Sequence, residues 1–489
     1  MKRILLITIP FFAVAFLNAQ SINDAIRYSM FEVGGTARTV GVGGAIGALG
    51  ADFSVLSTNP AGLGAYRRSE FVFTPSLLFS NVTSNLENGG AGSFDRDKTN
   101  FNFNNAGFVL SSRPLSSSWH TANFAIGFNR TGNFNQSFFY EGTTQGSITD
   151  RFLELADGLA PNDLDGFEAG LAFDALAIFN PGQNQNTFYV NDFQPGEQVD
   201  KSQLVRRKGS VNELVLSFGG NYKEKLMVGA TVGIPFLNFE ETKTYTETDK
   251  LNQNPVFNEL TFGEKLKTDG VGVNFKFGLI YKLNKMLRFG AAVHTPTYYN
   301  LNDKFSTTLS YDFTDPNVSP VSEQSSPEGN FDYKIRTPWR LIGSAALLVK
   351  KHGFVSAEVE WLDYGSANFN FNNSSSRADI EFEQDLNNQV DNQLGTALNV
   401  RLGGEFVYEL YRFRAGFNIS ESPYKGDNST NSAFSLGAGI REKTFYIDVA
   451  YKRAIVNTDY IPYVAQASQQ LVKTEDERNK LMMTVGVKF

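Results

Sequence analysis

Apolar and polar residues alternate with a period of two through most of the chain after position 70, and this pattern predicts β-strands. In the C-terminal stretch one face is polar or small, and the other face consists of Leu481, Met483, Val485, Val487 and Phe489. The same alternation recurs over residues 271–281, 398–408, 411–419 and 445–451. A soluble β-sandwich also alternates, so the period alone does not place these strands in a membrane.

The connections between the predicted strands alternate in length. Short joins are expected near residues 113–118, 223–224, 284–285, 351–352, 409–410 and 441–442. Long polar stretches separate them near residues 85–98, 142–207, 246–259, 314–329, 372–396, 421–431 and 457–478. Antiparallel transmembrane barrels have short periplasmic turns, long extracellular loops and an even strand count, which here comes to about fourteen. The sequence therefore predicts an all-β outer-membrane barrel over residues 70–489, with aromatic side chains near the strand ends as interfacial girdles.

The N-terminal nineteen residues resemble a secretory signal peptide. Lys2 and Arg3 precede an apolar run from Ile4 to Leu17, and cleavage is expected between Ala19 and Gln20. No later stretch reaches the length of a transmembrane helix. We expect export to the outer membrane of a Gram-negative cell, with outer-membrane lipid and lipopolysaccharide as surroundings. The C-terminal Phe489 is the expected contact with the outer-membrane assembly machinery.

Composition excludes several classes of protein. The chain of 489 residues has no cysteine, so disulfides, cysteine metal sites and a lipoprotein anchor are excluded. Its net charge of −7 argues against a nucleic-acid-binding protein. With 44 Phe and 19 Tyr among 489 residues, it does not resemble a disordered chain.

One long loop has a different pattern. Within the extracellular stretch 142–207, residues 148–180 show helical spacing of apolar positions, and Pro161 separates two short amphipathic helices. We expect this insertion either to pack onto neighbouring loops or to capture a ligand.

No catalytic constellation emerges. The three histidines, His120, His294 and His352, lie far apart in the sequence without metal-ligand spacing. The glycine-rich stretch 41–47 has Ile46 where a dinucleotide-binding motif needs its third glycine. Glu358 and Glu360 alternate with apolar residues on one strand, so we expect them to face the lumen rather than form a glycosidase pair. The sequence predicts no enzyme, no cofactor and no metal site.

A barrel of about fourteen strands is too wide for side chains alone to fill, so its lumen is either a water channel or plugged. Residues 20–69, which contain the glycine-rich segment 34–66, are available as a plug, here called the hatch. Inward wall charges suited to binding a plug are Lys276, Arg288, Arg401, Glu405, Arg412, Arg414, Asp448 and Lys452. A candidate apolar ligand pocket comprises Ile46, Leu49, Phe53, Leu56, Ile280, Ile342, Leu348 and Met482.

The hatch segment, with its Asn59-Pro60-Ala61, is similar to the N-terminal hatch of the FadL/TodX family of outer-membrane hydrocarbon transporters. Later segments resemble that family too, over residues 335–349, 358–369 and 401–424. The sequence as a whole, including the Asn-Ala-Gln at the end of the signal peptide, resembles the Bacteroidetes branch of the family. The resemblance implies a fourteen-stranded barrel, plugged by the hatch, that takes up long-chain fatty acids or aromatic hydrocarbons and releases them sideways at a kinked strand. The candidate hatch and gating residues are Gly34, Gly35, Gly43, Gly44, Asn59, Pro60 and Ala61. Within a strand expected over residues 121–140, the candidate kink is Gly132 and Asn133.

Two functions follow as hypotheses. The first is passive transport of hydrophobic molecules through this hatch-gated barrel. The second is a non-transporting barrel that acts as a structural or docking subunit of a larger outer-membrane complex, with the long polar loops as contact surface. Whether the hatch gates a path or only seals the lumen stays open at this point.

Overall fold

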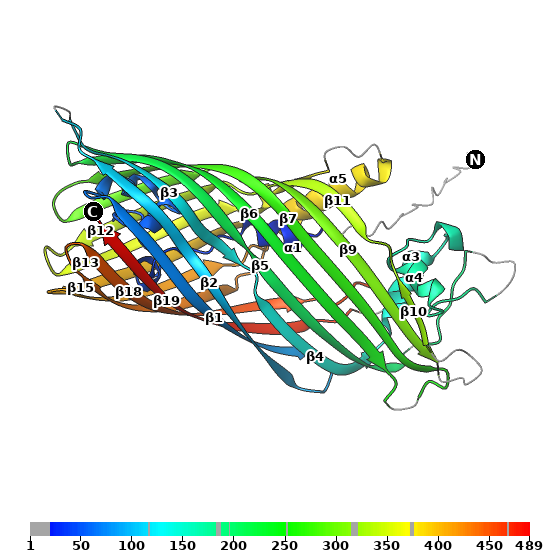
Figure 1. The fold of residues 1–489 in the computed structure, drawn as a ribbon. Helices are drawn as coiled ribbons and strands as arrows, with labels where there is room; N and C mark the ends of the chain where they lie inside the picture. The colour runs from blue at the N-terminus through cyan, green and yellow to red at the C-terminus, as the bar shows by residue number, and fades with distance from the viewer. Residues whose placement is uncertain are drawn as a thin grey trace, which may run out of the picture.

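The computed structural model describes residues 20–115, 118–181, 187–194, 196–250, 253–313, 321–371, 376–466 and 469–489. The predicted signal peptide lies outside the described residues. Its architecture is a closed antiparallel β-barrel, because β1 pairs with β2 on one side and with the last strand, β19, on the other (Figure 1). Closure leaves no free sheet edge between the first and last strands.

Strands account for most of the wall. The first nine are β1 (Glu70–Leu86), β2 (Ser93–Ser112), β3 (Trp119–Asn133), β4 (Gln136–Gln145), β5 (Gln198–Tyr222), β6 (Leu226–Thr248), β7 (Phe257–Lys282), β8 (Leu287–His294) and β9 (Tyr298–Phe313). The others are β10 (Val321–Ser325), β11 (Gly329–Arg336), β12 (Arg340–Leu348), β13 (Gly353–Asp363), β14 (Asn368–Asn370), β15 (Thr396–Tyr408), β16 (Tyr411–Glu421), β17 (Thr430–Arg441), β18 (Phe445–Tyr460) and β19 (Val472–Lys488).

Within the described residues these nineteen strands combine into fourteen wall strands, as predicted. Four wall strands are interrupted, so that β3 continues as β4, β8 as β9, β10 as β11 and β12, and β13 as β14. Three neighbouring interruptions, at residues 295–297, 337–339 and 364–367, lie at one level of the wall. The alternation in the sequence did not reveal these breaks, because each spans only a few residues.

The outer surface of the wall carries a continuous apolar band. On β18, for example, Phe445, Ile447 and Val449 are exposed, whereas Tyr446 and Asp448 point inward and are buried. The same alternation holds on the neighbouring strands, which confirms the predicted apolar-out and polar-in pattern of a membrane barrel. Among the described helices, none has the length and apolar character needed to cross a membrane.

The two ends of the barrel differ. The joins after β5, β7, β12, β15 and β17 span only a few residues and lie at the end where the chain terminates (Figure 1). This is the periplasmic end, because periplasmic turns are short. Phe489 is exposed there, and its N–H donates to the Ser69 carbonyl at 3.0 Å.

The hatch occupies the lumen ahead of β1. It contains α1 (Ile22–Ser29), α2 (Ala37–Gly41) and two 3₁₀ helices, η1 (Phe53–Ser57) and η2 (Pro60–Ala65). Apolar hatch residues pack directly on the wall, as Phe53 does beneath Gly107 of β2 and Gly127 of β3. The lumen at this level is therefore filled by protein.

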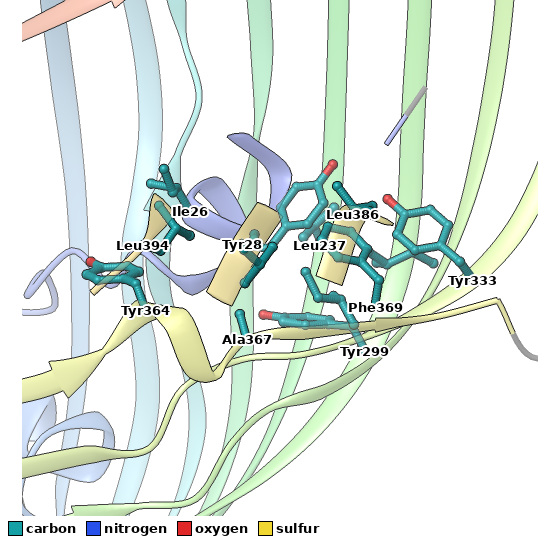
Figure 2. Packing of buried hydrophobic residues seen from close by; sticks show 14 of the residues in the cluster. Ile26, Tyr28, Leu237, Tyr299, Tyr333, Tyr364, Ala367, Phe369, Leu386 and Leu394 are labelled. Carbon is teal, nitrogen blue, oxygen red and sulfur yellow. The ribbon is translucent and has the colours of Figure 1, made fainter. Parts of the chain in front are cut away.

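The extracellular end is covered by helical segments. The insertion between β4 and β5 forms α3 (Ile148–Ala156), η3 (Pro161–Asp163) and α4 (Ala169–Asp174), as the helical spacing predicted. Three further α-helices were not predicted: α1 and α2 in the hatch, and α5 (Arg377–Gln393) between β14 and β15. Figure 2 shows Tyr28 of α1 within a buried cluster that includes Leu386 of α5 and Tyr299 of the wall. The hatch thus continues from the periplasmic end to a level where it is covered by an extracellular helix.

Candidate functional site

The Asn59-Pro60-Ala61 sequence lies against the inner faces of β6 and β7. The Asn59 side chain accepts a hydrogen bond from the Ala61 N–H at 3.2 Å and so caps η2. Its Nδ2 donates to the Gly47 carbonyl at 2.6 Å and to the Leu279 carbonyl of β7 at 3.2 Å. A Cβ at wall residue Gly278 would lie 1.9 Å from Asn59 Oδ1, so a glycine is required there. One side chain therefore orders the hatch locally and ties it to the wall.

The second close contact is the turn at Gly43 and Gly44. Both glycines have positive φ, +64° and +83°, which residues with a side chain rarely adopt. The turn meets wall residues Gly403 of β15 and Gly416 of β16, where an added Cβ would lie 2.1 Å from a hatch backbone atom. The glycines permit a backbone-to-backbone contact that larger residues would block.

A buried ion network on the wall holds the adjoining part of the hatch. Arg401 pairs with Glu358 at 2.8 Å and with Glu360, and Arg340 also pairs with Glu360 at 2.6 Å. Glu358 accepts a hydrogen bond from the Gly47 N–H of the hatch at 2.9 Å. The prediction that Glu358 and Glu360 face the lumen agrees with this arrangement, and two acids balanced by two arginines leave no free carboxylate pair for catalysis.

A second network runs from the wall into the hatch itself. Arg414 pairs with Glu405 and with Asp448, both at 2.7 Å. Glu405 also lies 3.6 Å from Arg38 of the hatch, which in turn lies 3.9 Å from Asp52. Arg38 and Asp52 are the only charged residues of the glycine-rich segment 34–66, a sequence signal that could have identified them as anchors.

Other wall groups make single contacts with the hatch. Arg288 donates to the Leu49 carbonyl at 3.1 Å, and Lys480 lies 3.1 Å from Glu32. On the far side, wall residue Glu213 accepts from Ser57 at 2.8 Å. Most of the inward charges singled out in the sequence thus lie near the hatch or pair with groups that hold it. Arg412 does not, since it donates to carbonyls of its own turn.

The residues of the predicted apolar pocket do not surround one cavity. Ile46, Leu49, Phe53 and Leu56 pack in one hatch–wall cluster, with Leu348 at its margin. Met482 and Ile280 belong to two other clusters, and Ile342 is buried on β12. The side chains in these three clusters are packed contacts between hatch and wall. Ile342 instead lines an open apolar pocket of about 680 Å³ together with Leu279, Leu341 and Trp361.

The interior cavity next to the hatch is small and polar. It has a volume of about 50 Å³ and lies at the C-terminal end of α1, beside residues 28–31 of the hatch. Glu213, Lys276, His294 and Arg340 line it, together with several threonines. A cavity of this size and polarity does not suit a hydrocarbon, since apolar ligand sites span 300–1,000 Å³ or so.

The predicted kink coincides with a discontinuity of the wall. The pairing of β3 with β5 shifts register between Arg130 and Gly132, and β3 ends at Asn133. The single strand expected over residues 121–140 is therefore two strands, because β4 turns inward: its Phe139 carbonyl accepts from the inward-facing Ser84 of β1 at 2.6 Å. The ladder between β2 and β3 stops at the Asn105–Asn129 pair. Lateral release at this break stays a prediction.

The helical insertion packs onto the extracellular ends of the wall strands. Phe152 of α3 contacts Phe262 of β7, within a buried cluster that unites both helices with several strands. Arg151 pairs with Glu168 through two hydrogen bonds of 2.5 and 2.9 Å. Burial raises the pKa of the Glu168 carboxyl, and the Arg151 guanidinium opposes that effect. This packing fits the simpler expectation for the loop, whereas ligand capture stays a prediction.

The sequence shows no metal-ligand or catalytic pattern. No group of three or more histidines or carboxylates in the described ranges is placed to hold a metal ion. His294 contacts the Thr58 carbonyl of the hatch at 2.6 Å, while His120 and His352 lie at the periplasmic end.

Fold and site together define a hatch-plugged outer-membrane β-barrel. In fold the chain is similar to a Pseudomonas aeruginosa FadL homologue, with 12% identity over 94% of this chain and 100% of that chain and a TM-score of 0.53. It is also similar to the toluene transporters TbuX of Ralstonia pickettii (15% identity, 94% and 99% of the chains, TM-score 0.52) and TodX of Pseudomonas putida (13%, 94% and 100%, 0.52). At these identities the likeness establishes the shared FadL/TodX-type fold.

A comparison with protein-family profiles assigns the chain to one family. The profile named BamG matches residues 184–444, more than half of the chain. The chain therefore belongs to the BamG family. No curated protein matches the chain significantly in sequence.

Proposed function

We propose that this protein is a sealed β-barrel that serves as a subunit of the outer-membrane assembly machinery. The observation that carries the proposal is the hatch–wall seal. The hatch is tied to the wall strands β7, β13 and β15 through Asn59, the Gly47 contact with Glu358 and the Arg38 contact with Glu405. Displacing the hatch would break the Arg38–Glu405 ion pair and the Gly47 hydrogen bond to Glu358, and breaking a buried ion pair costs several kcal/mol. Such a barrel is suited to a structural role better than to repeated gating.

Membership of the BamG family supports the same proposal, because the family name links it to the outer-membrane assembly machinery. The extracellular ends offer contact surfaces for a partner, since the wall strands β5, β6, β7 and β9 extend well beyond the apolar band. The polar cavity beside α1 does not itself suit a hydrocarbon.

The test is co-purification from native membranes. A tagged chain extracted in mild detergent is expected to bring down a second outer-membrane barrel protein in stoichiometric amount. Depletion of the chain is expected to lower the amount of heat-modifiable, folded barrel proteins in the outer membrane. A lone monomer together with unchanged levels of other barrel proteins would refute the proposal.

A second function has a specific observation in its favour. The break between β2 and β4 is a discontinuity in the wall next to the predicted kink at Gly132 and Asn133. Toluene transporters share the fold, so passive passage of long-chain fatty acids or aromatic hydrocarbons, with lateral release at this break, is the alternative. Uptake of radiolabelled oleate and toluene by a deletion strain decides it, because unchanged uptake excludes transport. A variant with Asn59→Ala and Pro60→Ala then tests whether the hatch takes part.

A further inference from the structure

Cationic side chains gather on one arc of the outer surface of the barrel. Antiparallel pairing places Lys208 of β5, Glu240 of β6, Lys267 of β7 and Lys304 of β9 in one row. These strands lie side by side in Figure 1. Arg206 and Lys265 lie in the next row away from the apolar band, and Lys334 and Arg336 lie two and three rows toward it. The set is here called the basic arc, and it comprises Arg206, Lys208, Lys265, Lys267, Lys304, Lys334 and Arg336.

The basic arc stands immediately beyond the apolar band. On β7, Val271 is the last exposed apolar residue, and Lys267 is the second outward position above it. Four residues of a strand tilted by about 40° rise roughly 10 Å, so Lys267 is near the level of the outer-leaflet headgroups. Arg336 pairs with Tyr298, another exposed apolar residue, and therefore lies at the upper margin of the band itself.

Four acids lie among the seven cations of the arc, which leaves an excess of three positive charges; the acids are Glu240, Asp269, Glu328 and Asp332. Lys208, Lys267 and Lys304 have carboxylates at 3.0, 2.7 and 3.6 Å, but their side chains remain 60%, 44% and 50% exposed. The other four members of the arc make no ion pair among the described residues, although Arg336 donates to the Ser366 carbonyl; they are Arg206, Lys265, Lys334 and Arg336. Exposed pairs contribute little on their own, so these cations remain available to a ligand.

Another part of the outer surface, over β19, β1 and β2, has the reverse character. There β2 presents Asp95 and Asp97, and β19 presents Glu475 and Glu477. The whole chain carries a net charge of −7, so the basic arc is a local exception to an acidic protein. The charge is polarised around the circumference of the barrel.

We propose that the basic arc binds the phosphate groups of an anionic glycolipid in the outer leaflet. The height of the arc on the barrel favours a lipid over a protein as the ligand. Lipid headgroups surround the barrel at that height whether or not a protein is bound. Clustered lysine and arginine at a membrane surface attract anionic headgroups, with a contribution from each cation. This site is independent of both functions proposed above.

The experiment compares two variants that remove equal charge. The arc variant combines Arg206→Gln, Lys265→Gln and Lys334→Gln, which breaks no ion pair. The control combines Lys285→Gln, Lys351→Gln and Lys443→Gln in exposed periplasmic turns. Binding of bisphosphorylated lipid A and of its dephosphorylated form is measured by titration in neutral-lipid nanodiscs and by native mass spectrometry.

Wild-type protein is expected to bind the phosphorylated lipid more tightly than the dephosphorylated one, and less so at high salt. The arc variant should lose on the order of a hundredfold in affinity for the phosphorylated form, whereas the control retains wild-type affinity. Equal loss in both variants, or no preference of the wild type for the phosphorylated lipid, overturns the proposal. Capture of an acidic protein by the arc with lipid binding unchanged overturns it too. Heat-modifiability establishes that each variant is folded, and the wild-type lipid comparison remains decisive if one variant is not.

Discussion

Replacing Arg401 by alanine removes the centre of the larger hatch–wall network. Arg401 makes ion pairs with both Glu358 and Glu360, and all three side chains are buried. After the substitution Glu360 retains Arg340, but Glu358 retains only the Gly47 N–H as a described partner. The hatch at Gly47 would then rest on a buried carboxylate that has no cation.

The cost follows from the burial of that carboxylate. Removing one partner of a buried ion pair destabilises proteins by about 3–5 kcal/mol, since the remaining charge is not solvated. If this cost acts on the contact between hatch and wall, the equilibrium for local hatch release rises roughly a hundred- to several-thousand-fold. The global barrel should change less, because its backbone hydrogen bonds are untouched.

Two measurements test this effect on the hatch. Hydrogen exchange should accelerate for hatch amides near Gly47 and not for the wall strands, since the substitution weakens the seal locally. In planar bilayers the Arg401→Ala variant should show transient ion conductance that the wild type lacks. The matched control is Arg453→Ala, which removes the partner of Glu477 in an exposed pair and should cost less than about 1 kcal/mol.

A rescue variant sharpens the outcome. The combination of Arg401→Met and Glu358→Gln removes one buried charge of each sign, leaves the Arg340–Glu360 pair in place and should restore much of the protection that Arg401→Ala loses. The reasoning is wrong if Arg401→Ala leaves both hatch exchange and conductance at wild-type values. It is also wrong if the exposed Arg453→Ala control has an equally large effect.

Three further substitutions test separate contacts. Asn59→Ala should destabilise the hatch by about 0.5–2 kcal/mol through loss of the η2 cap, with faster exchange of nearby amides as the readout, and unchanged exchange would contradict the cap. Gly278→Ala should lower the temperature of the gel-mobility shift, because its Cβ would lie 1.9 Å from a hatch atom; Gly343→Ala, with nothing within 4 Å, is the matched control and should be neutral. Arg151→Ala should expose the helical insertion to protease at pH 8, because Glu168 is left buried and charged. Burial raises the pKa of Glu168, so the variant loses stability of the insertion as the pH rises above the ordinary pKa of a glutamate. The extra digestion should therefore diminish toward pH 5. Equal digestion at both pH values would rule this out.

The sequence predicted the wall well because the wall is encoded locally. A period of two reports which face of a strand meets lipid, and short polar joins report where the chain reverses, so the fourteen wall strands and their turns followed from neighbouring residues. The inward direction of Glu358 and Glu360 followed from the same alternation. The identity of their partner, Arg401 on another strand, did not, because it depends on strand register.

The interior of the barrel was harder to predict, because its contacts join residues that are far apart in the sequence. Ile280, Ile342 and Met482 have the composition of an apolar pocket, but only the path of the hatch decides whether they face a cavity or a packed backbone. Helix α5 was missed because only Leu386 and Val390 of its side chains are buried, too few to stand out from a polar loop. Long-range placement, rather than residue type, determines these features.

The position of the hatch in the chain has a consequence for biogenesis. Hatch residue Ala37 donates its N–H to Thr484 of β19 at 2.7 Å, and Thr484 also bonds Thr74 of β1 across the closing seam. The first and last parts of the chain therefore meet at one point, separated by 447 positions. Contacts of such long sequence separation form late in folding. The barrel cannot close natively on an empty lumen, and the arrival of β19 completes the hatch and the wall in a single step.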